Sequence, residues 1–361
     1  ITNTFYSYHY INRSEYNSYK YDGILDTTLT NKIANANLDD ATINANMINS
    51  NYVMAYNEYD YFEYFIIVII KVVSPQYNTK SICVSFFSKH SANNDYNTLE
   101  VLHEWKEQNE SADFVVTIKQ EPRAGACCAR NKGLEAVKTP YVMFFDSDDT
   151  MIPTHIESAL RALQADKSLD IVGWDVTVNL LDGKAVKKRF SVNDVLYNHI
   201  FLSSFATLRY AARTDLIRAV GCWNEAIAGW NDYELGVRIA LKNPRMLKLT
   251  EGVGVNVYSQ ATSITGTNFS STPGKWEAAL DSCEASLRRA GKADFVKWIE
   301  TRRAILAGMY RKEGDKANSD RLLLQVVGRT TNWRQRTFYR FVCRFIAAGG
   351  RGVAILAKMF L

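Results

Sequence analysis

The sequence has no long hydrophobic run. The longest uninterrupted run of aliphatic and phenylalanine side chains, Phe65 to Ile70, is six residues long and ends at Lys71. A helix needs about 20 apolar residues to cross a bilayer, so no segment is expected to span one. The first 20 residues also lack the basic and then apolar stretches of a secretory signal. These absences favour a cytoplasmic location.

Paired metal-binding cysteines and internal repeats are also missing. The six cysteines of the 361 residues stand far apart or as one adjacent pair, without the spacing of a zinc site. Reduced and mostly buried thiols are therefore expected. With 47% hydrophobic and 22% charged residues, the composition is that of a globular protein with a sizeable core.

Carboxylate side chains are absent from residues 329–361, which hold seven arginines and lysines. Because the whole chain carries only +5, the other 328 residues sum to about −2. Arginines recur at every fourth position beside phenylalanines: Arg336, Arg340 and Arg344 with Phe338, Phe341 and Phe345. This pattern predicts an amphipathic helix on an anionic membrane surface, and a last helix with a solvated basic face is the alternative. No motif for nucleic acid accompanies the charge, so nucleic acid is not an expected partner.

The chain divides into three parts by composition. Residues 1–64 contain eleven Asn and eleven Tyr and receive no fold assignment. Residues 65–270 alternate strand and helix patterns, which predicts a mainly parallel sheet flanked by helices. Residues 271–361 lose the strand pattern, and helical spacing over 274–327 predicts an α-helical annex before the basic tail.

Strands and helices of the middle part are predicted from short apolar runs and from capping residues. A helix over 98–108 follows the capping pair Asn97 and Glu100, and another follows Pro153. The strand candidates are residues 65–73, 81–87, 114–119, 141–145, 170–174 and 252–258.

An acidic turn follows the strand at residues 141–145. Asp146, Asp148 and Asp149 come directly after its last residue, at the strand end where open α/β sheets bind ligands. Carboxylate oxygens suit Mg²⁺ or Mn²⁺, which keep open positions for phosphate oxygens. A solvated acidic turn is the alternative interpretation.

Two further segments carry polar residues at helix starts. Residues 120–134 run from a strand end through a glycine turn into a helix with Arg130, and a helix N-terminus with a guanidinium can hold a diphosphate. In residues 228–235, Asp232 and Glu234 begin another helix. Taken singly, Arg130 is also compatible with helix-surface decoration, and Asp232 or Glu234 with a carboxylate that favours the helix dipole.

Together these segments resemble the family 2 glycosyltransferases, which are inverting nucleotide-sugar enzymes of GT-A fold. The resemblance covers roughly residues 65–265. Its motif residues are Gln120, Gly125, Ala129 to Leu134, Phe144 to Asp149, Gly221 to Glu225, and Asn231 with Asp232. It implies a Rossmann-like GT-A domain and a hexosyltransferase-type enzyme of polysaccharide biosynthesis.

The resemblance also implies roles for single residues. Asp146 would contact the nucleotide ribose or the metal, and Asp148 would ligate the Mn²⁺ or Mg²⁺ that bridges the diphosphate. Asp232 would be the base that takes the proton of the acceptor hydroxyl. Asp95, in a turn that departs from the family's Asp-Asp-Gly-Ser, is the candidate for binding the nucleobase.

Departures from the family pattern concern the first and last strands. The family has a helix before its second strand, but here Ser81 follows Pro75 to Asn78 almost at once. The histidine that often follows the family's last strand as a metal ligand is not evident in residues 258–263. Metal affinity is therefore expected to depend on the substrate diphosphate.

Two other functions remain open at this point. Asp146, Asp148 and Thr150 also fit the nucleophile loop of haloacid-dehalogenase-like phosphatases, although that loop usually opens its domain. A non-catalytic membrane-associated protein with a decayed GT-A fold is the other. The preferred prediction is a metal-dependent inverting glycosyltransferase with a nucleotide-sugar donor and a glycan or lipid-linked acceptor. It would be cytoplasmic and peripheral to the inner membrane face.

Overall fold

The computed structural model describes most of the chain from residue 114 onward. The described residues are 69–72, 80–87, 103, 106–108, 110, 114–121, 123, 125–146, 149–259 and 268–361. The Asn- and Tyr-rich segment 1–64, Asp95 and Asp148 lie outside them, as does most of the helix predicted over 98–108. Among the described residues, no helix has both the length and the apolar character needed to cross a membrane.

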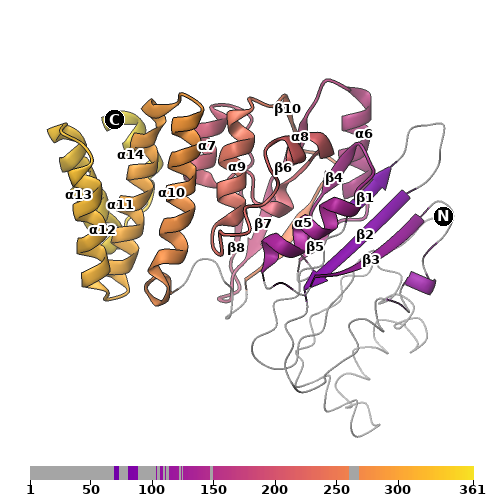
Figure 1. Ribbon diagram of the computed structural model, residues 1–361, viewed down its shortest axis with the longest axis horizontal. Helices are drawn as coiled ribbons and strands as arrows, with labels where there is room; N and C mark the ends of the chain where they lie inside the picture. The colour runs from indigo at the N-terminus through magenta and orange to yellow at the C-terminus, as the bar shows by residue number, and fades with distance from the viewer. Residues whose placement is uncertain are drawn as a thin grey trace, which may run out of the picture. The chain divides into compact units, whose positions relative to one another are not determined.

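The first sheet contains three strands in the order β1-β2-β3 (Figure 1): β1 Ile69–Val72, β2 Lys80–Phe87 and β3 Phe114–Glu121. β1 pairs antiparallel with β2, and β2 pairs parallel with β3. The antiparallel pair has a simple cause, because a parallel partner needs a crossover of a dozen or more residues and only residues 73–79 separate the two strands. β1 also contacts β4 of the second sheet.

The second sheet contains four strands in the order β10-β6-β9-β4. Their bounds are β10 Met246–Leu249, β6 Ile171–Trp174, β9 Tyr210–Arg213 and β4 Tyr141–Met143. β10 and β6 are parallel, whereas β9 runs antiparallel to both β6 and β4. This sheet carries the turn with Asp146 at the end of β4.

A third sheet has the order β5-β11-β7-β8: β5 Thr150–Met151, β11 Val255–Tyr258, β7 Val176–Asn179 and β8 Ala185–Lys188. Only β7 and β11 are parallel in it. The GT-A-like α/β fold is thus observed, but the expectation of a mainly parallel sheet was wrong. The described sheets are mixed, because hairpins such as β7-β8 and the antiparallel β9 stand where a fully parallel sheet would have crossovers.

Helices α5 Ala126–Ala136 and α9 Asn231–Leu241 position the candidate site. α5 begins after Gly125, whose φ of 119° is a conformation that glycine adopts without steric cost. Its buried face includes Ala129 and Leu134, and these pack with Leu235 and Ile239 of α9 into one apolar core. The two helices therefore share that core, which fixes the distance between their N-terminal side chains.

The remaining helices of this part are α6 His155–Ala165, α7 Val195–Leu202 and α8 Thr214–Ala219. α6 follows Pro153 as predicted and buries His155, Ala159 and Leu163 at helical spacing.

The annex contains five α-helices, of which α10 packs against α9, and α11 packs against α10, α12 and α13 (Figure 1). They are α10 Pro273–Arg289, α11 Val296–Lys312, α12 Lys316–Gly328, α13 Trp333–Ala347 and α14 Val353–Phe360. One buried cluster joins Tyr233 and Val237 of α9 to Leu280 of α10 and Leu306 of α11. The annex and the glycosyltransferase-like part thus share a core, and the predicted domain bounds of 1–64, 65–270 and 271–361 remain a prediction.

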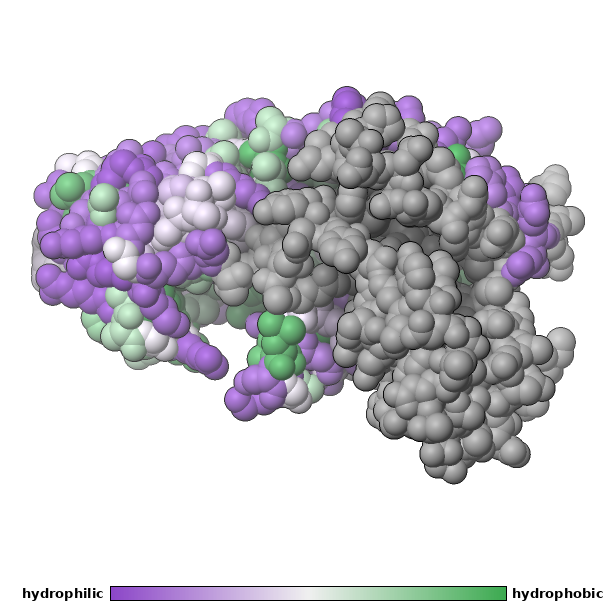
Figure 2. All heavy atoms as spheres, turned by 90° about the horizontal axis from the view of Figure 1, so that it is seen from below, coloured by the Kyte–Doolittle hydropathy of each residue, from purple (hydrophilic) through white to green (hydrophobic). Residues whose placement is uncertain are grey.

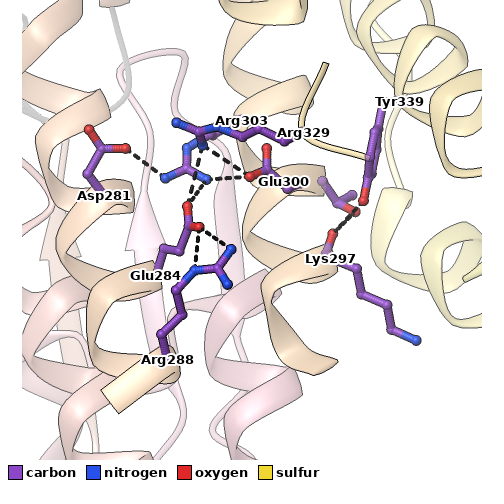
Figure 3. A network of polar contacts seen from close by, with 9 residues as sticks. Asp281, Glu284, Arg288, Lys297, Glu300, Arg303, Arg329 and Tyr339 are labelled. Carbon is purple, nitrogen blue, oxygen red and sulfur yellow. Dashed lines mark hydrogen bonds and ion pairs between the residues drawn. The ribbon is translucent and has the colours of Figure 1, made fainter. Parts of the chain in front are cut away.

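A buried ionic network holds three of the annex helices together (Figure 3). The guanidinium of Arg303, 2% exposed, lies 2.7 Å from both Asp281 and Glu284 and 2.8 Å from Glu300. Arg329 reaches Glu300 from the end of α12, with 3.1 Å between the charged atoms. Loss of Arg303 would leave the buried Glu300 with Arg329 alone, and removal of one partner of a buried ion pair typically costs about 3 to 5 kcal/mol.

The basic tail is a packed part of this annex. Phe338, Tyr339 and Val342 of α13 are buried against Ala304 and Ile305 of α11. Arg336 donates to the carbonyl oxygens of Val327 and Thr330 rather than facing solvent freely. The expectation that Phe338 and Arg336 belong to a membrane-facing side was therefore wrong, because the apolar side of the helix is used for packing.

Candidate active site

Arg130 joins two of the predicted site residues. Its Nη2 lies 2.9 Å from Oδ1 of Asp146, at the end of β4, and its Nη1 lies 3.1 Å from Oδ1 of Asp232, in the first turn of α9. The arginine is 4% exposed. Burial alone would lower the pKa of Arg130, but the charges of Asp232 and Asp146 outweigh it and raise the pKa. The guanidinium is therefore a fixed cation between the two carboxylates.

Asp232 accepts hydrogen bonds on both carboxylate oxygens. Besides Arg130, the indole Nε1 of Trp223 donates to Oδ1 over 3.0 Å. The backbone N–H of Thr207 donates to Oδ2 over 3.2 Å, and the Thr207 hydroxyl donates to the same oxygen. The side chain remains 25% exposed. Asp232 is thus an oriented carboxylate in the first turn of α9.

Asn131 fixes the turn that supplies Trp223. Its Oδ1 accepts from the backbone N–H of Trp223, and its Nδ2 donates to the Trp223 carbonyl, both over 2.9 Å. The indole ring also packs edge-on against Phe144 at 4.4 Å between centroids. Two adjacent residues of α5 therefore position the Asp232 carboxylate. Arg130 contacts it directly, and Asn131 holds Trp223, which donates to it.

The buried side chain of Asp149 accepts a hydrogen bond from the backbone of strand β11. It is 6% exposed, and its Oδ1 accepts from the backbone N–H of Tyr258 over 2.9 Å. This bond ties Asp149 to the end of β11, so the Asp149 carboxylate is part of the folded framework.

The other two acidic residues near the start of α9, Glu234 and Glu225, form ion pairs and hydrogen bonds with residues other than Arg130. Glu234 is 1% exposed, paired with Arg238 at 2.6 Å, and accepts from the Ser282 hydroxyl at 2.8 Å. Glu225 pairs with Arg123 at 2.5 Å and accepts from Asn131 at 3.0 Å. Asp232 is therefore the carboxylate of this group that faces Asp146 through Arg130.

Asp146 has the properties of a hard-metal ligand. Its side chain is 27% exposed at a strand end, and only its Oδ1 receives a donor among the described residues. Its Oδ2 therefore remains suited to Mg²⁺ or Mn²⁺, which prefer carboxylate oxygens. The part of the chain that the structure describes contains no cluster of three metal-ligating side chains. Asp148, the predicted second ligand, lies outside that part.

Sequence reasoning missed Thr207 and the role of Trp223. Thr207 comes from a short 3-10 turn, Thr207–Arg209, without any motif in its neighbourhood. Trp223 stood inside the Gly221 to Glu225 motif, so its position in that motif was the available signal. Trp174 is fully buried and donates to the Leu208 carbonyl, which makes it a core residue.

A polar pocket of about 380 Å³ lies beside this site, on the side of the Trp223 turn that faces α10. Its lining includes Asn131, Glu225, Arg238 and Arg289, whereas Arg130, Asp146 and Asp232 are not part of it. The pocket is therefore distinct from the space between the two carboxylates.

Comparison with known proteins finds one family that resembles part of the chain. Residues 52–206 match the sequence model described as "Glycosyl transferase family 2". The matched segment contains Arg130 and the turn after β4. Residues 52–206 are thus similar to family 2 glycosyltransferases, and the described part of the chain has a GT-A-like α/β fold with a helical C-terminal region.

Solved structures share this fold at low sequence identity. The structure of TarS from S. aureus aligns at 14% identity and a TM-score of 0.50, covering 70% of this chain and 45% of that chain. Residues 1–349 of S. aureus TarS align at 13% identity and a TM-score of 0.51, covering 76% and 81%. The chain therefore spans less than half of the longer TarS chain. No curated protein sequence matches it.

Proposed function

We propose that the protein transfers a sugar from a nucleotide-sugar donor to a hydroxyl group of a glycan or lipid-linked acceptor, with inversion at the anomeric carbon. The observation that carries the proposal is the contact of one buried guanidinium, Arg130, with both Asp146 and Asp232. It brings a carboxylate on the donor side and a candidate base close together, as a single displacement requires.

In the proposed step, Asp232 accepts the proton of the acceptor hydroxyl while that oxygen attacks the anomeric carbon. The bond from this carbon to the donor diphosphate breaks, and the diphosphate leaves with the electron pair. Trp223 and Thr207 hold the base in place, and Arg130 supplies a positive charge next to the donor side.

Asp146 and Asp148 are the residues proposed to hold Mg²⁺ or Mn²⁺. The bound ion would neutralise charge on the departing diphosphate. Asp95 remains the proposed nucleobase contact. The phosphatase alternative, with Asp146 as nucleophile, is set aside because the family match includes this turn.

A donor screen tests the proposal. Thermal shift with a panel of nucleotide sugars, with and without Mn²⁺, should reveal a donor that stabilises the fold by mass action. Transfer to a glycan acceptor should then follow for that donor and fail for an aryl phosphate. No stabilisation by any nucleotide sugar would favour the non-catalytic interaction protein instead.

Attachment of the tail to an anionic membrane is part of this proposal. Arg340 and Arg344 of α13 are exposed and have no carboxylate partner among the described residues, and Phe341 beside them is 46% exposed. Each such cation near an anionic leaflet contributes on the order of 1 kcal/mol. Arg340→Gln with Arg344→Gln should weaken binding to anionic vesicles without unfolding the annex.

A further inference from the structure

The β7-β8 hairpin ends in a tight apolar tip. Leu180 pairs with Lys184, since its N–H donates to the Lys184 carbonyl over 2.8 Å, and residues 181–183 form the loop. Gly183 has a φ of 80°, the left-handed conformation that closes a three-residue hairpin loop. The tip therefore has a defined conformation that presents Leu180 and Leu181 next to each other.

Exposed apolar side chains gather at this hairpin. Leu181 is 70% exposed, Leu180 37% and Val186 38%, and Tyr258 of the neighbouring strand β11 is 44% exposed. They are four of the seven exposed large apolar side chains described between residues 114 and 259. Figure 2 shows a protruding hydrophobic group on the described surface in the region of this hairpin. Such a concentration is characteristic of a contact surface.

The tip lies at the end of the third sheet to which Asp149 is anchored, and Asp149 is three residues from Asp146 of the candidate active site. β7 and β11 are parallel and end together at the pair Asn179 and Tyr258. The N–H of Tyr258 donates to Asp149, three residues after Asp146. Leu180 and Leu181 follow β7 directly, so they extend past the edge where the turn after β4 is anchored.

The second strand of the hairpin is basic. Residues 181–189 are all exposed and hold four cations, Lys184, Lys187, Lys188 and Arg189, against one carboxylate, Asp182. Lys184 pairs with Asp182, and Lys187 approaches Asp175 at 3.6 Å. Lys188 and Arg189 have no carboxylate partner in the described part of the chain. Leucines at a tip with free cations behind them complement a surface that is apolar inside and anionic outside.

We propose that the β7-β8 hairpin is a membrane-contacting element that inserts Leu180 and Leu181 into an anionic lipid surface beside the active site. It would hold the end of the third sheet, where Asp149 is anchored, against the bilayer, where a lipid-linked acceptor presents its hydroxyl. The purpose of the contact rests on the lipid-linked acceptor of the proposed function, but the contact itself is independent of catalysis.

Vesicle binding of the full chain tests this element. Phosphatidylcholine vesicles containing phosphatidylserine should sediment the protein at low salt, and pure phosphatidylcholine should sediment less. Leu181→Ser and the double variant Leu180→Ser/Leu181→Ser should bind about tenfold or more weakly, because burying a leucine is strongly favourable. Lys188→Gln with Arg189→Gln should cost about fivefold per residue and weaken the salt dependence.

Matched controls separate the hairpin from general effects. Leu202→Ser with Leu247→Ser changes leucines that are 50% and 42% exposed elsewhere, and should leave binding unchanged. Lys242→Gln with Lys316→Gln is the charge control, and both residues are exposed. Arg340→Gln with Arg344→Gln measures the tail, whose effect should add to that of the hairpin.

Two results would overturn the proposal. One is equal vesicle binding by the leucine variants and the controls, and the other is loss of a concentration-dependent dimer in the leucine variants, which would make the tip a contact between copies. Hydrolysis of the nucleotide-sugar donor without acceptor should be unaffected in all variants. If no donor is ever used while vesicle binding still depends on Leu181, the proposed function fails and the membrane contact stands.

Discussion

At the residue scale, the candidate chemistry depends on the orientation of a single carboxylate. Asp232 receives donors from a side chain of α5, from an indole on the turn 221–225 and from the 3-10 turn with Thr207. These donors come from three separate elements, so the position of the carboxylate depends on all three being folded.

Asp232→Asn should remove the proposed base while keeping the shape of the side chain. A positioned base contributes about 10²- to 10⁴-fold, so transfer should fall by that factor while donor affinity stays within about threefold. Asp215→Asn is the matched control, because the Asp215 side chain is 96% exposed on α8. This variant should keep both the original rate of transfer and the original donor affinity. Transfer at the original rate in Asp232→Asn would mean that the base lies elsewhere.

Trp223→Phe should separate orientation from stability. The variant keeps an aromatic ring against Phe144 but loses the indole N–H to Asp232, so transfer should fall about tenfold with a stability loss of about 1 kcal/mol. Trp174→Phe loses a comparable buried hydrogen bond, to the Leu208 carbonyl, and should lose stability without a fall in specific activity. Similar activity losses in both variants would assign Trp223 a purely structural role.

At the element scale, α9 is held in place by close packing against α7. Gly236 faces the ring of His199, and a Cβ added at Gly236 would lie 2.2 Å from the nearest ring carbon. His199 accepts from the Phe205 N–H at Nδ1 and donates from Nε2 to the Tyr233 carbonyl over 2.8 Å. The ring therefore has two fixed bonds and little freedom to move aside.

Gly236→Ala should destabilise the protein by about 1 to 3 kcal/mol, because overpacking outweighs the helix propensity gained. The urea midpoint measures this loss. Gly274→Ala in the first turn of α10 is the control, since nothing lies within 4 Å of its added Cβ. That control should be neutral or slightly stabilising, and equal effects of the two substitutions would contradict the packing argument.

Stability should fall as the pH drops below about 6.5. Burial lowers the pKa of His155 and of His199 to about 4, whereas histidine in an unfolded chain titrates near 6.5. The unfolded chain binds protons first, so the stability present above about pH 6.5 is lost as the pH falls toward 4, on the order of 3 kcal/mol per histidine.

Urea denaturation between pH 7 and pH 5 measures this dependence. In this range most carboxylates remain ionised, which leaves the histidines as the main titrating groups. His155→Gln retains an acceptor for the Gly254 N–H and should reduce the slope of stability against pH. A wild-type stability that is constant over this range would contradict the buried neutral histidines.

At the scale of the whole molecule, the annex and the glycosyltransferase part depend on each other. α9 carries Asp232 at its N-terminus and packs its Val237 against the cluster of α10 and α11. α13 in turn lies so close to α11 that a Cβ on Gly308 would be 2.7 Å from the Cys343 carbonyl oxygen. Stability of the annex therefore supports the position of the candidate base.

Deletion of residues 329–361 should destabilise the chain rather than only release it from vesicles. The deletion removes Phe338, Tyr339 and Val342, each contributing about 1.5 to 3 kcal/mol of burial, and uncovers the face of α11. Thermal unfolding should show a lower midpoint, with ANS binding to the uncovered face. Arg340→Gln with Arg344→Gln should keep the original midpoint, and an unchanged midpoint after deletion would contradict the packed tail.

Much of the architecture could be predicted from the sequence. All six predicted strands are found, with shifted ends, because each contains an apolar or β-branched run that favours extended backbone. The strands that escaped prediction are two to four residues long, such as β5 and β9. They form because neighbouring strands offer hydrogen bonds, which no local pattern records.

The sequence by itself predicted which residues carry the chemistry, since the motifs around Arg130, Asp146 and Asp232 resemble those of the family 2 glycosyltransferases. Only the tertiary structure decided which of them meet, because residues about 100 positions apart are brought together by the apolar core to which α5 and α9 both contribute. The same holds for the tail and the β7-β8 hairpin. The periodicity of a sequence predicts that an element has an apolar face but not what that face contacts. The apolar face of α13 is buried against α11. Leu180 and Leu181, at the end of β7, stay exposed.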